Sequence, residues 1–254
     1  MVEVTPIPAF RDNYIWLLQH DGHAVVVDPG DAAPVQAKLK ENRLRLDAIL
    51  VTHHHDDHIG GVAELLHTHQ AIAYAPRGER YPFAHRSVAE GDRVELETLG
   101  IRLNVMETPG HTLDHLVYYG ANSLFCGDTL FGCGCGRLFE GSCAQMYHSL
   151  QRLASLPSET GVYCAHEYTL HNIRFARQLE PYNADLALRE ARVTQLRAEG
   201  KPSLPSTLQI ERMTNPFLRC GMPAVIDAAS RASKQPLNDP IAVFCAIRNE
   251  RNHF

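Results

Sequence analysis

A short internal stretch of the chain concentrates side chains that bind metal ions. Residues 52–61 read THHHDDHIGG, in which His53, His55, Asp57 and His58 offer four candidate ligands. Imidazole nitrogens and carboxylate oxygens both bind Zn²⁺ and other divalent first-row metals. One ion cannot easily take all four ligands from so short a segment. The spacing therefore favours two adjacent ions, with the first pair of ligands on one ion and the second pair on the other.

An expression tag or a solvated patch is the ordinary alternative for a run of histidines. A tag is terminal and uniform, whereas this cluster is internal, contains aspartates, and lies between the apolar run 48–52 and the pair Gly60-Gly61. The run 48–52 is typical of a strand buried on both faces. Because His54 and Asp56 alternate with the candidate ligands, we expect them to point away from the ions.

Three further ligand-type side chains each follow a predicted strand. His111 lies in the segment TPGHT, Asp128 in CGDT and His166 in AHEY. A single histidine after a strand is more often an ordinary hydrogen-bonded residue. Three such positions together with a four-ligand cluster favour one shared site, because loops held by rigid elements are where binding residues concentrate.

Apolar runs of strand length alternate with helical spacing up to about residue 168, which predicts a mixed α/β layer structure. Later segments have mainly helical patterns. We therefore expect a first domain over 1–169 and a smaller helical domain over 170–254. The predicted strands are 14–18, 24–28, 48–52, 71–75, 93–96, 101–107, 115–119, 123–126 and 162–164, and the predicted helices are 32–40, 63–69, 146–154, 170–180, 183–199, 223–233 and 240–249, with a loop at 202–205.

The bulk composition excludes some classes of protein. The formal net charge of −5 lacks the basic balance of a general nucleic-acid binder. No apolar run approaches the roughly 20 residues that span a bilayer. The first residues also lack the apolar core of a secretory leader. These features predict a cytoplasmic protein, and nothing in the sequence requires more than a monomer.

The chain has seven cysteines, an odd number, and in a cytoplasmic protein we expect them to be reduced thiols. Cys133 and Cys135 are too close together for half of a zinc ribbon, and no second cysteine pair follows. A thiol at Cys133 near the metal ligands could still bind metal adventitiously or oxidise.

The four signatures THHHDDHIGG, TPGHT, CGDT and AHEY resemble those of the metallo-β-lactamase superfamily. The resemblance implies an α+β fold, a four-layer αββα sandwich with its metal site at one edge, followed here by the helical domain. It also implies how the ligands divide between the ions. The first ion takes His53, His55 and His111, the second takes Asp57, His58 and His166, and Asp128 bridges both.

Further segments resemble the glyoxalase II (hydroxyacylglutathione hydrolase) family. They are IPAFRDNYIW at 7–16, FCGDTLF at 125–131, GCGRLFEG at 134–141, HEYTL at 166–170 and AIRNER at 246–251. Position 56 departs from the pattern, because Asp56 stands where the family often has another histidine.

This resemblance implies hydrolysis of S-D-lactoylglutathione and related 2-hydroxyacyl glutathione thioesters to glutathione and D-lactate, the second step of methylglyoxal detoxification. It implies that Arg137, Arg248 and Arg251 bind the carboxylates of glutathione. Tyr168 would donate a hydrogen bond to its peptide part, and backbone groups near Phe139 would add more.

The mechanism expected from two ions is attack on the thioester carbonyl by a hydroxide that bridges them. Asp57 and Asp128 would position this hydroxide. Zinc is the expected metal, and iron and manganese also fit His and Asp ligands.

Three alternatives remain open. A glutathione persulfide dioxygenase on the same fold uses one iron, and the complete second ligand set and the helical domain argue against it. A metal-dependent nuclease would need a basic groove. A non-catalytic metal-binding protein would not need an intact ligand set with room for water.

Overall fold

The computed structural model describes residues 2–254, and the chain divides into two compact units. Unit 1 runs to Thr108 and resumes over Asp114–Gly127. Unit 2 comprises Pro109–Leu113 and Asp128–Phe254. The candidate ligands are therefore shared between two compact parts of the chain.

Unit 1 contains a six-stranded mixed sheet. Its first three strands pair antiparallel and the next three pair parallel. The side chains of neighbouring residues such as Ile49 and Leu50 are both fully buried, because they point to opposite faces of a sheet that is covered on both sides. The order across the sheet is β1 (Glu3–Ala9), β2 (Asn13–His20), β3 (His23–Val27), β4 (Arg45–Leu50), β5 (Ile72–Pro76) and β6 (Arg86–Val88).

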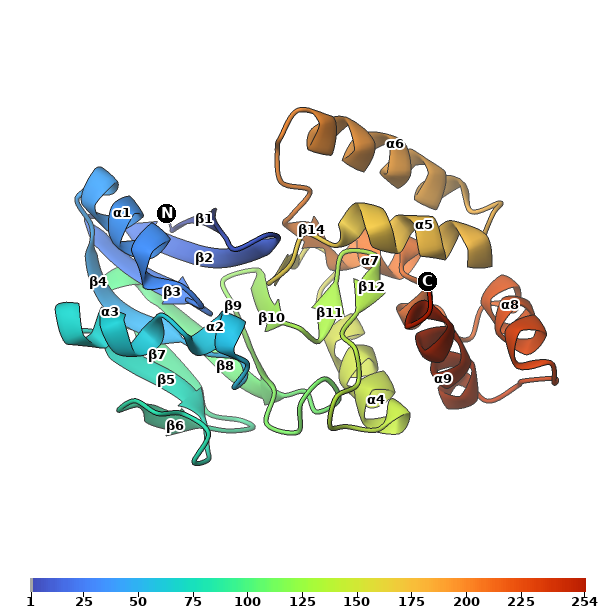
Figure 1. Ribbon diagram of the computed structural model, residues 1–254, viewed down its shortest axis with the longest axis horizontal. Coiled ribbons are helices and arrows are strands. Elements are labelled where there is room, and N and C mark those ends of the chain that lie inside the picture. Colours follow the sequence, from blue (N-terminus) through green and yellow to red (C-terminus); the bar gives the residue numbers. More distant parts are fainter. Residues whose placement is uncertain (1) are drawn as a thin grey trace. The chain divides into compact units, whose positions relative to one another are not determined.

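Two helices, α1 (Ala32–Asn42) and α3 (Val62–Thr68), cover one face of this sheet (Figure 1). Val35 and Leu39 of α1 and Val62 and Leu65 of α3 belong to the same buried cluster as residues of β1–β5. Helix α1 begins where the Asp31 carboxylate accepts a hydrogen bond from the Ala33 amide at 2.9 Å.

An antiparallel meander of four strands completes unit 1. It consists of β7 (Arg93–Leu96), β8 (Ile101–Glu107), β9 (Leu116–Gly120) and β10 (Ser123–Gly127), with the 3-10 turn η1 (Glu97–Leu99) between the first two. The fully buried Tyr118 hydroxyl of β9 donates to the carbonyls of Val51 and Tyr74, at 2.8 and 3.3 Å. The meander therefore lies against the first sheet near the point where β4 ends.

Unit 2 is mainly helical. Its helices are α4 (Cys143–Ala154), α5 (Thr169–Leu179), α6 (Ala184–Ala198), α7 (Leu208–Thr214), α8 (Pro223–Ser233) and α9 (Pro240–Arg251), with the 3-10 turn η2 (Pro216–Leu218). It also contains the pair β13 (Gly161–Cys164) and β14 (Ser206–Thr207) and the hairpin of β11 (Leu130–Phe131) and β12 (Gly134–Cys135). Phe217 of η2 packs between Phe175 of α5 and Phe244 of α9.

The prediction that all cysteines are reduced thiols is wrong for two of them. Cys143 of α4 and Cys245 of α9 form a disulfide with a Cα–Cα distance of 5.5 Å. The two residues are 102 positions apart, so no sequence pattern marks them as partners. The other five cysteines lie outside the disulfide and are buried.

The predicted long elements agree with the structure to within a few residues. Strand β1 was not predicted, since Pro6 and Pro8 interrupt it. It lies at the edge of the sheet, where a missing backbone N–H leaves no ladder bond unmade. Residues 202–205 form a loop as expected.

None of the helices over residues 2–254 combines the length and the hydrophobicity that a membrane-spanning helix needs.

Candidate metal centre

Unit 1 presents the histidine cluster directly after β4. His53 Nε2 and His55 Nδ1 lie 3.0 Å apart. At metal–nitrogen distances of roughly 2.0–2.1 Å, two nitrogens bound to one ion in tetrahedral geometry lie about 3.3 Å apart. The ligand atoms of His53 and His58, and those of Asp57 and His58, also lie within 4.8 Å of each other. The donor set and its spacing therefore fit divalent ions.

A buried carboxylate behind the cluster fixes two of these imidazoles. Asp28 Oδ2 lies 3.1 Å from His58 Nδ1 and accepts from the Thr52 hydroxyl at 2.7 Å. Thr52 Oγ1 lies in turn 3.0 Å from His53 Nδ1. With Nδ1 protonated on both rings, Nε2 carries the lone pair that binds a metal, which is the usual role of residues behind a ligand. Asp28 was read in the sequence only as the end of a strand, and no sequence pattern identifies it.

Asp57 is held in place by two further contacts. Asn13 Nδ2 donates to Asp57 Oδ2 at 3.0 Å, and His58 Nε2 lies 3.5 Å from the same oxygen. A Cβ atom on Gly30 would lie 2.0 Å from the Asp57 carbonyl oxygen, so only glycine fits beneath this ligand. Asn13 was missed as a site residue, although it lies in the family-like segment 7–16.

His54 has a different environment from its neighbours. Its Nδ1 lies 3.0 Å from both carboxylate oxygens of Asp114, which also accepts from the Tyr81 hydroxyl at 2.6 Å. Asp56 is exposed in the first turn of α2 (Asp56–Ile59).

His115, which the sequence did not single out, is buried. Its ring stacks on the His53 ring with centres 4.8 Å apart, and its Nδ1 lies 3.1 Å from Thr108 Oγ1.

Unit 2 contains the other three candidate ligands in one group. Asp128 Oδ2 lies 3.3 Å from His111 Nε2, and Asp128 Oδ1 lies 3.4 Å from His166 Nε2. Each carboxylate oxygen of Asp128 thus faces a different imidazole. His111 Nδ1 donates to the Arg137 carbonyl at 2.7 Å, which leaves the lone pair of Nε2 available for a metal ion.

The predicted substrate residues also lie in unit 2. Phe139 is 60% exposed, and the Arg137 guanidinium lies 5.5 Å from the centre of its ring. Tyr168 stacks on His166 with ring centres 4.7 Å apart. Arg251 donates to Asn172 Oδ1 at 3.0 Å. These residues therefore lie close to the proposed ligands of unit 2 or on α9.

Arg248 differs from the other predicted arginines because it is buried. Its Nη1 donates to the Cys135 carbonyl at 2.8 Å, and its Nη2 donates to Asn252 Oδ1 at 3.1 Å. Burial and the nearby positive charge of Arg248 lower the pKa of Arg251. Two guanidinium groups that repel each other in this way favour binding of an anion.

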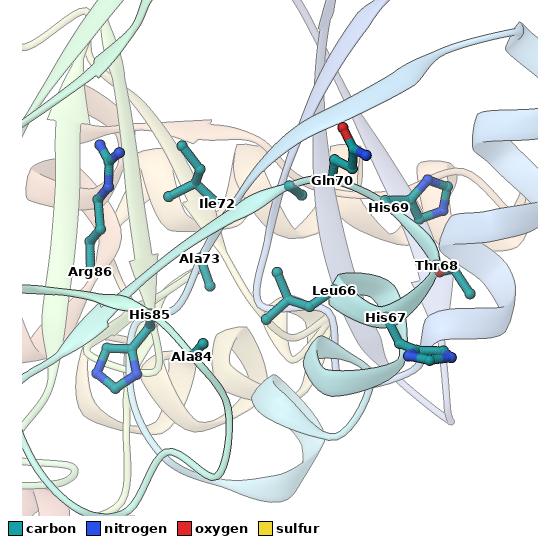
Figure 2. A pocket seen from close by; sticks show the side chains of 11 residues that line it. Leu66, His67, Thr68, His69, Gln70, Ile72, Ala73, Ala84, His85 and Arg86 are labelled. Atoms are coloured by element: carbon teal, nitrogen blue, oxygen red, sulfur yellow. The ribbon is translucent and has the colours of Figure 1, made fainter.

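A surface depression of about 650 Å³ in unit 1 contains three more histidines (Figure 2). His67, His69 and His85 line it, separated by apolar side chains such as Leu66 and Ile72 (Figure 2). His85 Nδ1 lies 3.0 Å from the Phe83 carbonyl oxygen, which occupies one of its two nitrogens. We do not assign this depression to the metal centre.

Comparison with known proteins defines the class first. Residues 9–166 match the model of the metallo-beta-lactamase superfamily. Among solved structures, ETHE1 from Myxococcus xanthus superposes on this chain with a TM-score of 0.66 at 24% sequence identity. The superposition covers 99% of this chain and 98% of the ETHE1 chain. The protein TTHA1623 in a di-iron-bound form has a TM-score of 0.62 at 26% identity, covering 84% of this chain and 100% of its own. The chain has the metallo-beta-lactamase fold, with a helical C-terminal region, as predicted.

The match of the C-terminal residues identifies the family within this superfamily. Residues 167–254 match the model of the hydroxyacylglutathione hydrolase C-terminus. The hydroxyacylglutathione hydrolase of Methylobacillus flagellatus is 54% identical to this chain over 254 residues. The alignment covers 100% of both proteins. That of Nitrosomonas europaea is 50% identical, with 100% of this chain and 97% of the relative covered. The chain belongs to the hydroxyacylglutathione hydrolase family. This confirms the resemblance and disfavours the dioxygenase and nuclease alternatives.

Proposed function

We propose that the protein hydrolyses S-D-lactoylglutathione and related 2-hydroxyacyl glutathione thioesters to glutathione and the free 2-hydroxy acid. The observation that carries the proposal is the family membership over the full chain, together with an Asp128 carboxylate whose two oxygens face His111 and His166. This reaction would be the second step of methylglyoxal detoxification.

We propose that seven side chains from the two units bind two divalent ions. The first ion would take His53, His55 and His111, the second would take Asp57, His58 and His166, and Asp128 would bridge them. Zinc fits the mixed nitrogen and oxygen donors, and iron and manganese also fit. The di-iron form of the similar protein TTHA1623 supports a two-ion site.

The ions, when bound, would lower the pKa of water and stabilise negative charge on the thioester oxygen. Asp57 and Asp128 would orient the attacking water by accepting hydrogen bonds. Asn13 would hold the Asp57 carboxylate through its 3.0 Å hydrogen bond. The thiolate of glutathione is a good leaving group, so no separate proton donor is required.

Positive charge in unit 2 would bind the two carboxylates of glutathione. Arg137 and Arg251 would contact them directly, since guanidinium groups pair well with carboxylates. Arg248 would contribute mainly through its charge, because both of its Nη atoms already donate within the protein. Tyr168 and the backbone near Phe139 would hydrogen-bond the peptide part.

We also propose a division into a catalytic domain over 1–169 and a substrate-binding domain over 170–254, which the family matches at 9–166 and 167–254 support. The net charge of −5 supports the absence of a nucleic-acid partner. We propose a monomer because nothing in the sequence requires an assembly. The proposed cytoplasmic location is tested by the redox state of Cys143 and Cys245 in freshly trapped cell extracts, because disulfides are rare in that compartment.

The direct test follows thiol release from S-D-lactoylglutathione by the purified chain. We expect turnover that a chelator abolishes and added Zn²⁺ restores. Asp57→Asn should lose most of the activity, whereas His69→Ala, in the depression of Figure 2, should keep it. A fully metal-loaded wild-type protein without turnover would reject the proposed activity.

A further inference from the structure

In the sequence, the hairpin β11–β12 lies between the proposed ligand Asp128 and the proposed substrate residue Arg137. Leu130 pairs with Cys135 and Phe131 with Gly134. Cys133 in the turn has a φ of 58°, a left-handed conformation that costs free energy for a residue with a side chain. Other contacts must therefore hold this turn.

Buried side chains from α7 and the residue that follows it hold three backbone groups of the hairpin. Glu211, which has no exposed surface, accepts from the Cys133 amide at 2.8 Å. Asn215 Nδ2 donates to the carbonyls of Gly134 and Phe131, at 2.9 and 3.3 Å. Asn215 Nδ2 also donates to Glu211 Oε2 at 3.2 Å, so these two side chains form one network.

The charge of Glu211 is balanced inside the protein. Arg189 of α6, only 8% exposed, donates to both of its carboxylate oxygens. Arg189 also donates to Thr214 Oγ1 at 2.6 Å and Ser206 Oγ at 3.2 Å. Breaking a buried pair of this kind leaves an uncompensated charge, so the network holds the Glu211 carboxylate in one orientation.

Two more side chains hold two further carbonyls of the hairpin. Asn172 of α5 donates to the Gly132 carbonyl at 3.1 Å, and Arg248 of α9 donates to the Cys135 carbonyl at 2.8 Å. Strand β12 lies beside α5 (Figure 1) and also contacts η2. We call the five side chains that act on this hairpin the hairpin clamp: Asn172, Arg189, Glu211, Asn215 and Arg248.

The clamped hairpin is coupled to two proposed metal ligands. After β12, the Gly136 amide donates to the Thr129 carbonyl at 3.2 Å. A Cβ atom on Gly136 would lie 2.0 Å from the Asp128 carbonyl oxygen, so the two segments are in close contact. The next residue, Arg137, provides the carbonyl that orients His111. A shift of the hairpin would therefore move Asp128 and turn the His111 ring.

We propose that the hairpin clamp is a positioning device for the metal centre, in which Glu211 and Asn215 set the geometry of Asp128 and His111 from a distance. This inference rests on the proposed ligand set. The helical region then has a role beyond substrate binding, because it fixes the segment that carries a bridging ligand.

The test compares Zn²⁺ affinity of full-length variants, first stripped of metal, by competition with a chromophoric chelator. Asn215→Ser keeps an oxygen that can accept from the Phe217 amide but cannot reach the hairpin carbonyls. Glu211→Gln is the more severe change. We expect Asn215→Ser to weaken Zn²⁺ binding roughly 10- to 100-fold, the range found when residues behind metal ligands are altered.

The matched control is Glu180→Gln. Glu180 is a buried carboxylate of unit 2 that pairs with Arg219 at 2.8 Å, as Glu211 pairs with Arg189, and its carboxylate is paired with Arg219 rather than with the hairpin. It should lower the melting temperature but leave Zn²⁺ affinity unchanged. Wild-type affinity in the folded Asn215→Ser variant, or an equal loss in Glu180→Gln, would overturn the proposal. Because no substrate is present, failure of the thioesterase assignment gives a separate result.

Discussion

The Nδ1 atom of His58 lies 3.1 Å from the Oδ2 atom of Asp28, a carboxylate that is only 4% exposed. The same carboxylate accepts from the Thr52 amide and hydroxyl, at 2.8 and 2.7 Å. One buried acid thus fixes the imidazole of a proposed ligand and the turn that starts the histidine cluster. It lies at the end of β3, far from the cluster in sequence.

Asp28→Asn tests this arrangement. An amide in place of the carboxylate removes the negative charge and presents a donor toward a ring nitrogen that must also donate. We expect Zn²⁺ affinity to fall roughly 10- to 100-fold, measured by chelator competition. Asp31→Asn is the control, because asparagine also caps a helix and should leave the affinity unchanged. Equal affinities in both variants would remove Asp28 from the metal centre.

Arg251 and Arg248 should have separable roles. Arg251→Ala should raise KM for S-D-lactoylglutathione about ten-fold or more with little change in kcat, because it removes a charge-assisted contact made equally in ground and transition states. Arg248→Ala should also raise KM, because it removes positive charge from the proposed substrate site, but it should in addition lower kcat and thermal stability, since it releases the Cys135 carbonyl. Steady-state kinetics distinguish the two, with the exposed Arg231→Ala as control. An unchanged KM for Arg251→Ala would exclude it from substrate binding.

The disulfide between Cys143 and Cys245 should stabilise the folded state. Closing a loop of 102 residues restricts the unfolded chain, and such a bridge contributes about 2–5 kcal/mol. Urea unfolding with and without reductant measures the difference in free energy of unfolding. The Cys143→Ala, Cys245→Ala double variant should match the reduced protein and should not respond to reductant. Identical curves for oxidised and reduced wild-type protein would contradict the expectation.

The free thiols should be inert in the native protein. Burial raises the pKa of Cys133 to about 12, and burial likewise raises the pKa of Cys135. At pH 8 both thiols therefore stay protonated, and a protonated thiol is a poor nucleophile and metal ligand. Labelling with iodoacetamide at pH 8 should modify no free cysteine until the protein is unfolded. Rapid native labelling of Cys133 would show instead that this thiol is accessible.

The candidate ligands can be proposed from the sequence because each one has a distinctive local setting. His53 and His58 lie in a dense cluster after an apolar strand, and Asp128 and His166 follow further strands. Strand and helix periodicity predicted a mixed α/β layer structure, whereas the four-layer fold class followed from the resemblance to the metallo-β-lactamase superfamily, and this fold class is confirmed. These signals are local, so a single sequence is enough to detect them.

The residues that orient the ligands could not be predicted in this way. Asp28, Asn13 and Glu211 act through contacts that join distant parts of the chain, and a buried acid has no characteristic spacing in sequence. The same reason explains the disulfide that was missed. For Arg248, the resemblance implied a role in binding substrate carboxylates, but nothing in the sequence indicated that its side chain is 6% exposed and bonded to backbone.

The measurement that tests the central claim most directly is the number of Zn²⁺ ions per chain after equilibrium dialysis, determined by elemental analysis for the wild-type protein and for Asp57→Ala. Two ions per wild-type chain, falling toward one in the variant, is the expected result, since Asp57 belongs to only one of the two proposed ligand sets. One ion per wild-type chain, or two ions in the variant with unchanged affinity, would contradict a pair of ions held by these seven side chains.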